Sequence, residues 1–237
     1  MSTYIYAITA SDHPVRLDGL TGVGEPASEV RTVKTDALTA VVSDAPEGLR
    51  AKRRDVSAHQ AVLERLMADG AVLPMRFGLV GPDDDQVAAA LEGNRDGYRE
   101  RLTELDGCLE FNLKVTRDED DLLTEIVHES DEIRRLNEFT REHPDAQNEK
   151  MRLGELITEE VKTRQEREAG EITDRLSPAA LNTAIGDPVQ DTLLNVSFLV
   201  EREKAAGFSE AVHKEAGRHS EAHTFRLNGP LPPYSFV

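Results

Sequence analysis

The chain has 237 residues, of which 45 are acidic and 28 are basic, so its formal net charge at pH 7 is −17. This length suggests one large or two small domains, and 38% apolar residues are typical of a folded chain rather than a disordered one. The negative charge argues against binding to nucleic acid or to an anionic membrane, because both attract positively charged proteins.

Other features indicate a cytoplasmic protein. The single cysteine, Cys108, cannot form an internal disulfide, which is typical of intracellular chains. The stretch MSTYIYAITASDH at the N-terminus has no positively charged region and no long apolar run, so we predict no signal or transit peptide. No apolar run approaches the roughly 20 residues that span a bilayer. We therefore expect no membrane partner.

Residues 1–80 are predicted to form an N-terminal α+β domain. Three β-rich stretches are predicted strands, the last two of which form a hairpin around a turn at Asp36: 3–9, 29–35 and 37–43. Apolar residues recur at helical spacing over 55–69, and Gly70 follows as a stop signal. His59 lies on this apolar stripe, so we interpret it as a buried, hydrogen-bonded histidine rather than a catalytic one.

The next stretch, AVLPMRFGLV at 71–80, contains one charged residue, Arg76. With a period of two, Met75 and Phe77 fall on one face of a predicted strand and Arg76 falls on the other. An unpaired buried charge is costly, so we expect a carboxylate to hold the guanidinium. Arg76 would then be a clamp at a domain boundary, and Arg76→Ala would weaken that junction.

Residues 81–237 are predicted to form the C-terminal domain. GPDDD at 81–85 predicts the start of a helix that runs to about Leu105, and CLEFNLKVT predicts a half-buried strand. Residues 117–175 hold 19 acidic and 10 basic side chains. Narrow apolar stripes there predict a charged helical hairpin, broken at His143-Pro144-Asp145, within an insertion that covers 117–187.

Regular structure is predicted to resume at 189. The patterns predict a strand, a helix, a further strand and an extended tail: 191–200, 203–220, 221–229 and 229–237. Without the insertion, helix, strand, strand, helix and strand follow each other. This order favours an α+β sandwich of helices on a sheet, similar to a ferredoxin-like fold.

Two acidic clusters could supply hard oxygen ligands for a metal ion: Asp83 to Asp85 and Asp118 to Asp121. Calcium loops space their ligands at alternate positions around a glycine turn, which neither cluster does. We favour two helix N-termini, where acidic side chains gain from the helix dipole. His219 and His223 are four residues apart, but a predicted break puts them on different elements, so we predict no metal site.

We find no pattern for catalysis. Neither Cys108 nor Ser57 has a recognisable paired base, and no nucleophile-elbow sequence is present. The glycines of GLTGVGEP at 19–26 lack the Lys-Ser/Thr ending of a phosphate-binding loop. We therefore predict a protein that is not an enzyme and has no catalytic residue, cofactor or metal. Two alternatives stay open: a metal-assisted enzyme of unknown substrate, and an acidic adaptor whose hairpin binds basic partners.

Several segments resemble the gas vesicle protein GvpF/GvpL family. They occur in family order and are YIYAI, AVVSD, AHQAVLERLMADGAVLPMRFGLV at 58–80, LLNVSFLV at 193–200 and LNGPLPPYSFV at 227–237. The resemblance implies two α+β domains, of which the C-terminal one is a modified ferredoxin-like fold. It also implies a cytoplasmic protein of gas vesicle assembly that contacts the hydrophobic shell protein GvpA and other vesicle proteins. It implies no activity or cofactor, and it fits GvpF and GvpL equally.

The tail offers apolar side chains on an extended segment: Leu231, Tyr234 and Phe236. It could contact a partner, or it could pack back on its own domain and seal a core. Together with Arg76, Phe77 and His59, these residues are our candidate structural or partner contacts. A shell protein with an apolar face needs a partner that masks this face before assembly, and an acidic carrier would keep the complex dispersed.

Overall fold

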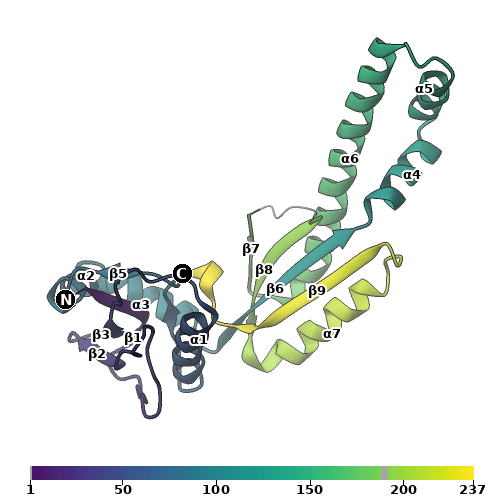
Figure 1. Ribbon diagram of the computed structural model, residues 1–237. Coiled ribbons are helices and arrows are strands. Elements are labelled where there is room, and N and C mark those ends of the chain that lie inside the picture. The colour runs from purple at the N-terminus through teal and green to yellow at the C-terminus, as the bar shows by residue number, and fades with distance from the viewer. Residues whose placement is uncertain (1, 188–191) are drawn as a thin grey trace. The chain divides into compact units, whose positions relative to one another are not determined.

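The computed structural model describes residues 2–187 and 192–237 (Figure 1). It is an α+β structure with two antiparallel sheets, and the chain forms two compact units. Unit 1 comprises Met1–Glu110 and Gly229–Val237, and unit 2 comprises Phe111–Asn228. The predicted domain boundary at residue 80 therefore lies inside unit 1, because the helices that follow it cover the first sheet.

Unit 1 is built on a sheet of five strands: β1 (Thr3–Ala10), β2 (Arg31–Lys34), β3 (Leu38–Asp44), β4 (Leu73–Pro74) and β5 (Val80–Gly81). Their order is β2-β3-β1-β4, and β5 also pairs with β1. The predicted hairpin is confirmed, since β2 and β3 pair antiparallel from Arg31 opposite Val42 to Lys34 opposite Thr39. Strand β1 lies inside the sheet, and most of its side chains are buried, so other elements must pack on both of its faces.

Three helices supply this cover: α1 (Arg53–Met67), α2 (Asp84–Gly93) and α3 (Arg95–Glu104). Tyr4 and Tyr6 of β1 pack with Leu63 of α1, whereas Ile5 and Ile8 line a cavity with residues of α2 and α3. Strict alternation would put Ile5 and Ile8 on opposite faces, but the register of β1 shifts between Ile5 and Ala7. Helix α1 thus covers one face of β1, and α2 with α3 covers the other. The single helix predicted up to Leu105 is two helices, divided at Asn94.

Unit 2 contains a sheet of four strands in the order β7-β8-β6-β9: β6 (Cys108–Arg117), β7 (Asn182–Ile185), β8 (Leu194–Glu201) and β9 (His223–Leu231). The ends of β6 and β9 belong to unit 1. Helix α7 (Ala205–Ala216) packs on this sheet, since the Phe208 ring lies 5.4 Å from Phe111 and 5.0 Å from Phe198. Residue 191, where a strand was predicted to begin, lies outside the described residues.

The charged insertion forms an arm that extends from the sheet of unit 2 (Figure 1). It has three helices rather than the predicted two: α4 (Glu119–Glu129), α5 (Asp131–Glu142) and α6 (Gln147–Leu176). Ser130 ends α4 and caps α5, where its Oγ accepts a hydrogen bond from the Ile133 amide. The predicted stripes do form a small core, in which Leu122, Ile126 and Ile133 meet apolar residues of α6. The predicted insertion 117–187 also includes strand β7.

Three short 3₁₀ helices complete the fold: Ser177–Ala179, Arg202–Lys204 and Tyr234–Phe236. The last of these lies in the tail that we predicted to be extended. Within the described ranges, none of the helices combines the length and the apolar character that crossing a membrane requires.

Candidate partner-contact site

An aromatic cluster lies in the core of unit 1, where β1, α1 and the segment after β4 meet. The rings of Tyr4 and Tyr6 are 4.8 Å apart, and the His59 ring lies 5.7 Å from Tyr4 and 5.5 Å from Tyr6. Phe77 packs edge-on at 6.0 Å from Tyr4 and 5.7 Å from His59. The tertiary structure thus brings together His59 and Phe77, two predicted contact residues.

Hydrogen bonds fix the orientation of this cluster. His59 Nε2 lies 3.1 Å from the Met75 carbonyl oxygen, which only accepts, so Nε2 carries the proton and donates. Burial lowers the pKa of His59, which keeps the ring neutral. Its Nδ1 therefore accepts from the Tyr4 hydroxyl at 2.9 Å, and the Tyr4 oxygen in turn accepts from the Gly78 amide at 3.2 Å.

Both tyrosines are protonated in this core. Burial raises the pKa of Tyr4 above its usual range, and it also raises the pKa of Tyr6. The Tyr6 hydroxyl lies 2.9 Å from Ser43 Oγ, and its oxygen accepts from the Val23 amide at 2.9 Å. His59 is thus the buried, hydrogen-bonded residue that the sequence suggested. The chain of bonds is structural, because every polar atom in it is satisfied within the core.

The cluster holds a turn, not the continuous strand predicted for 71–80. Strand β4 ends at Pro74, and Gly78 adopts a φ of +94°, a conformation that breaks the alternation. Met75 donates to the Tyr6 carbonyl and Ile5 donates to the Leu79 carbonyl, so residues 76–78 project from the edge of β1. Phe77 turns inward and Arg76 outward.

Arg76 is exposed, and among the residues the structure describes no carboxylate pairs with it. The expected ion pair is therefore not seen there, because the turn carries the guanidinium to the surface. Leu79 and Val80, which follow the turn, are 43% and 44% exposed. Residues 76–80 thus carry one exposed cation and two exposed apolar side chains, and we call this segment the signature turn.

Replacing Gly78 tests the turn. We expect Gly78→Ala to lower the free energy of unfolding of unit 1 by about 1 kcal/mol, because φ near +94° strains a residue with a Cβ although nothing obstructs that atom. Gly154→Ala is the matched control: it lies inside α6 with open space around it and should stabilise slightly. Urea unfolding measures both, and equal effects would show that the turn conformation is not required.

The tail packs on the same core. Tyr234 lies against the cluster around Tyr4, and Phe236 is 8% exposed. Burial, reinforced by the negative charge of Glu110, raises the pKa of Tyr234 to about 12. Ser235 donates to the Glu110 carboxylate from its amide at 2.8 Å and from its hydroxyl at 2.7 Å. The tail thus seals a core, and Leu231 before it is half-buried.

Glu110 is the residue that sequence reasoning missed. The alternation of β6 put it on the polar face of a half-buried strand, but it is only 4% exposed because the tail covers it. No local pattern could reveal this, since its partner lies 125 residues further along the chain. The one local indication of an unusual role was that Glu110 stands among apolar residues at the beginning of the strand.

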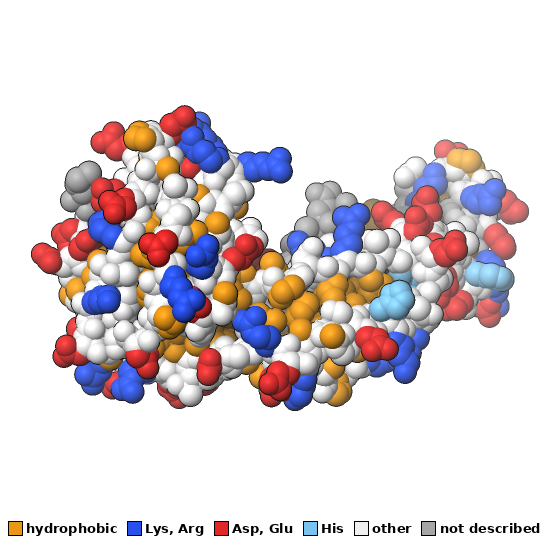
Figure 2. Space-filling view, turned by 90° about the horizontal axis from the view of Figure 1, so that it is seen from below, with side chains coloured by type: hydrophobic (Ala, Val, Ile, Leu, Met, Phe, Trp, Pro, Cys, Tyr) orange, Lys and Arg blue, Asp and Glu red, His pale blue; other side chains and the backbone are white. Residues whose placement is uncertain are grey.

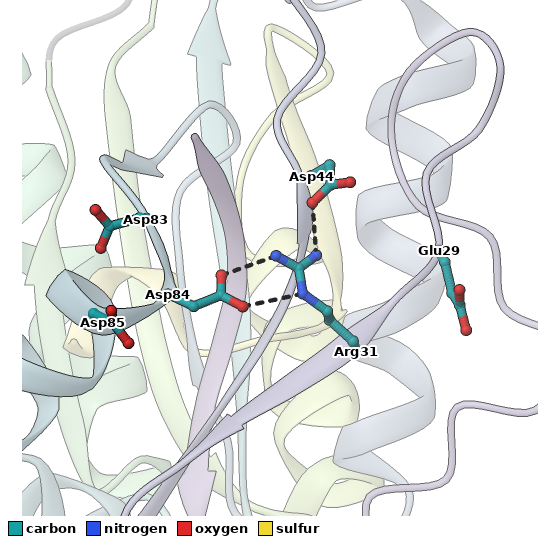
Figure 3. A pocket seen from close by; sticks show the side chains of 6 residues that line it. All are labelled: Glu29, Arg31, Asp44, Asp83, Asp84 and Asp85. Carbon is teal, nitrogen blue, oxygen red and sulfur yellow. Dashed lines mark hydrogen bonds and ion pairs between the residues drawn. The ribbon is translucent and has the colours of Figure 1, made fainter. Parts of the chain in front are cut away.

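The acidic residues around Arg31 line a hollow of about 460 Å³ in unit 1 (Figure 3). Arg31 of β2 forms ion pairs with Asp44 at 3.0 Å and Asp84 at 2.8 Å. Asp83 caps α2 by accepting from the Gln86 amide at 2.8 Å. Two carboxylates are therefore already neutralised by a side chain of the protein and a third by a helix end.

The second acidic cluster lies in unit 2, where Asp118 caps α4 by accepting from the Asp121 amide at 2.9 Å. Both predicted helix N-termini are confirmed. The break between His219 and His223 is also confirmed, although their rings lie 4.9 Å apart. Each ring faces its own glutamate, and in the described parts of the chain no three ligating side chains are arranged to hold a metal ion.

The face of the molecule in Figure 2 shows acidic side chains interspersed with lysines and arginines. The net charge is therefore not gathered into a single patch on this face. What distinguishes the chain is instead an α+β fold of two units in which two peptide segments, the signature turn and the tail, are held on one aromatic core.

The chain belongs to the gas vesicle synthesis protein GvpL/GvpF family, whose model matches residues 2–237. It is 44% identical over 240 residues to gas vesicle protein F of Streptomyces sp. (strain CB03234), with all of both chains covered. It is 28% identical to gas vesicle protein L of the same strain, covering 99% of this chain and 92% of that protein. The family that the sequence resembled is thus confirmed.

Solved structures agree with this assignment. The crystal structure of the gas vesicle protein GvpF from Anabaena sp. PCC7120 matches with a TM-score of 0.84 at 26% identity, covering 99% of this chain and 97% of that one. GvpF from Microcystis aeruginosa matches with a TM-score of 0.82 at 25% identity, covering 99% and 98%. The chain is therefore a member of a family of gas vesicle proteins, and this family does not consist of enzymes.

Proposed function

We propose that this chain is an assembly protein of the gas vesicle that binds the hydrophobic shell protein GvpA, together with other vesicle proteins. The observation that carries the proposal is the family match along residues 2–237. The acidic surface supports it, because a net charge of −17 would keep complexes with an apolar shell subunit dispersed. Such a protein would act in the cytoplasm and at the growing vesicle.

The proposal extends to the type of family member. One Streptomyces strain holds both an F and an L protein, and this chain is 44% identical to the first and 28% identical to the second. The difference favours an F-type member. Unit 2 runs strand, helices, strand, strand, helix, strand with the order β7-β8-β6-β9, which supports a modified ferredoxin-like fold with an inserted helical arm.

The signature turn is the surface that we propose for partner contact. Arg76 is exposed, and Leu79 and Val80 lie beside it, so the turn combines a cation that can bind a carboxylate with apolar side chains that can be buried. Phe77 and His59 anchor the turn to the core of unit 1, because their rings pack together and His59 bonds to the Met75 carbonyl. Tyr234, Phe236 and Leu231 take part indirectly, because they cover the core on which the turn rests.

A pull-down tests the function. Tagged protein from a vesicle-forming cell should recover GvpA, and Arg76→Glu should reduce the recovery by about tenfold, since a central arginine contributes about 1.4 kcal/mol or more to an interface. Arg53→Glu is the control, because Arg53 is also exposed but lies on α1. Wild-type protein that recovers no vesicle protein would refute the function, whereas equal recovery by both variants would refute only the site.

A further inference from the structure

The tail packs on a part of unit 1 that we call the groove, which consists of Glu110 and the core surface that Tyr234 contacts. We define the tail segment as residues 232–236. Pro232, Pro233 and Phe236 are buried, and Tyr234 packs against the core of the unit. Glu110 lies at the base of this groove, and its two carboxylate oxygens accept from the amide and the hydroxyl of Ser235. The groove thus binds the segment, which ends in a 3₁₀ turn, through side-chain packing and through one buried carboxylate.

The tail segment and the groove each lose favourable contacts when they separate. Removing the tail segment would take the two donors of Ser235 from the Glu110 carboxylate and would uncover it, since Glu110 is 4% exposed only while the tail covers it. The aromatic core beneath Tyr234 would also face water, which is unfavourable for apolar surface. A segment of this chemistry in the groove therefore stabilises unit 1.

The contact does not require that the segment come from the same molecule. The segment directly follows β9, whose residues Gly229 and Pro230 are exposed, and the segment itself holds only a single turn of 3₁₀ helix. It could leave the groove without disturbing a sheet of unit 1. Exchange of an identical segment between two copies remakes every contact, so its cost lies mainly in the entropy of association.

We propose that the groove at Glu110 is also a docking site for the tail segment of a second copy of this chain, so that copies can associate by exchanging tails. A tethered segment has an effective concentration in the millimolar range, so the intramolecular contact dominates in dilute solution. Exchange dominates where the chain's own tail is weakened or where copies are concentrated.

Two full-length variants test this by complementation. Glu110→Leu has a defective groove and a normal tail, whereas the double variant Tyr234→Ala, Ser235→Ala has a normal groove and a defective tail. We expect their mixture at about 50 µM to form at least tenfold more dimer than either variant alone, measured by light scattering and by energy transfer between labels. If both variants remain folded by circular dichroism and the mixture stays monomeric, tail exchange is refuted.

If either variant fails to fold, the wild-type chain gives the answer. A synthetic peptide of residues 229–237 at several millimolar should displace the chain's own tail. The displacement would appear as faster hydrogen exchange at the Ser235 amide, which is bonded to Glu110 in the closed form. A scrambled peptide of the same composition is the control. Unchanged exchange with the native peptide, or equal effects of both peptides, would overturn the proposal.

Discussion

Arg117→Met is expected to destabilise unit 2 by about 3 kcal/mol. The Arg117 side chain, at the end of β6, is 5% exposed and pairs with Glu125 of α4 and Glu168 of α6, with Asp121 at 3.7 Å. Methionine would fill the volume but would leave these carboxylates without their cation. Breaking a buried ion pair costs 3 to 5 kcal/mol, and we expect the lower value because Glu125 is 40% exposed.

The measurement is urea unfolding of Arg117→Met beside a matched control, Arg101→Met. Arg101 pairs with Glu104 on the surface of α3, where both side chains are about half exposed. An exposed pair contributes at most about 1 kcal/mol, so this control should change little. Equal losses in the two variants would show that the network around Arg117 does not hold the arm to the sheet. Hydrogen exchange in α4 and α6 would locate the effect.

Tyr4→Phe is expected to destabilise unit 1 by about 2 kcal/mol. The substitution keeps the ring but removes the hydroxyl that donates to His59 Nδ1 and accepts from the Gly78 amide. Both groups would be left in a core where Tyr4 is fully buried, and a buried polar group without a partner costs about 1 to 3 kcal/mol. The signature turn should also loosen, because Gly78 loses its anchor.

Thermal unfolding and hydrogen exchange at residues 76–80 measure this effect. Tyr98→Phe is the control, since it makes the same chemical change at a half-buried residue of α3. Over the residues that it describes, the structure shows no hydrogen bond of the Tyr98 hydroxyl. A Tyr4→Phe variant as stable as the Tyr98→Phe variant would contradict the role given to the Tyr4–His59 hydrogen bond. Unchanged hydrogen exchange at the Gly78 amide would show that the conformation of the turn does not depend on the aromatic cluster.

Local patterns predicted most of the strands and helices correctly. The alternation in CLEFNLKVT places Leu109, Phe111, Leu113 and Val115 in the core, and all four are buried. The aspartates at 83 and 118 cap helices, as their position before apolar periodic stretches indicated. These predictions succeed because strand alternation and capping depend on residues within a few positions of each other.

Two errors have different origins. The stretch 71–80 alternates like a strand, yet Gly78 turns it and Arg76 reaches solvent, and the hydroxyl of Tyr4, 74 residues away, accepts a hydrogen bond from the Gly78 amide. That contact is distant in the chain, so the local pattern could not reveal it. The helical insertion was expected to have two helices, but Ser130 ends one helix and caps the next. This cap is a local signal, three residues from its partner, and the prediction from apolar stripes missed it.

The sequence by itself determined that the chain is acidic, that it has an α+β pattern and that it belongs to one vesicle protein family, because these properties reside in composition, in local periodicity and in motif order. Only the tertiary structure decided that the signature turn and the tail meet on one aromatic core, and that Glu110 is buried beneath Ser235. The physical reason is that burial depends on partners distant in the chain, and a residue's own pattern does not specify which segment will cover it.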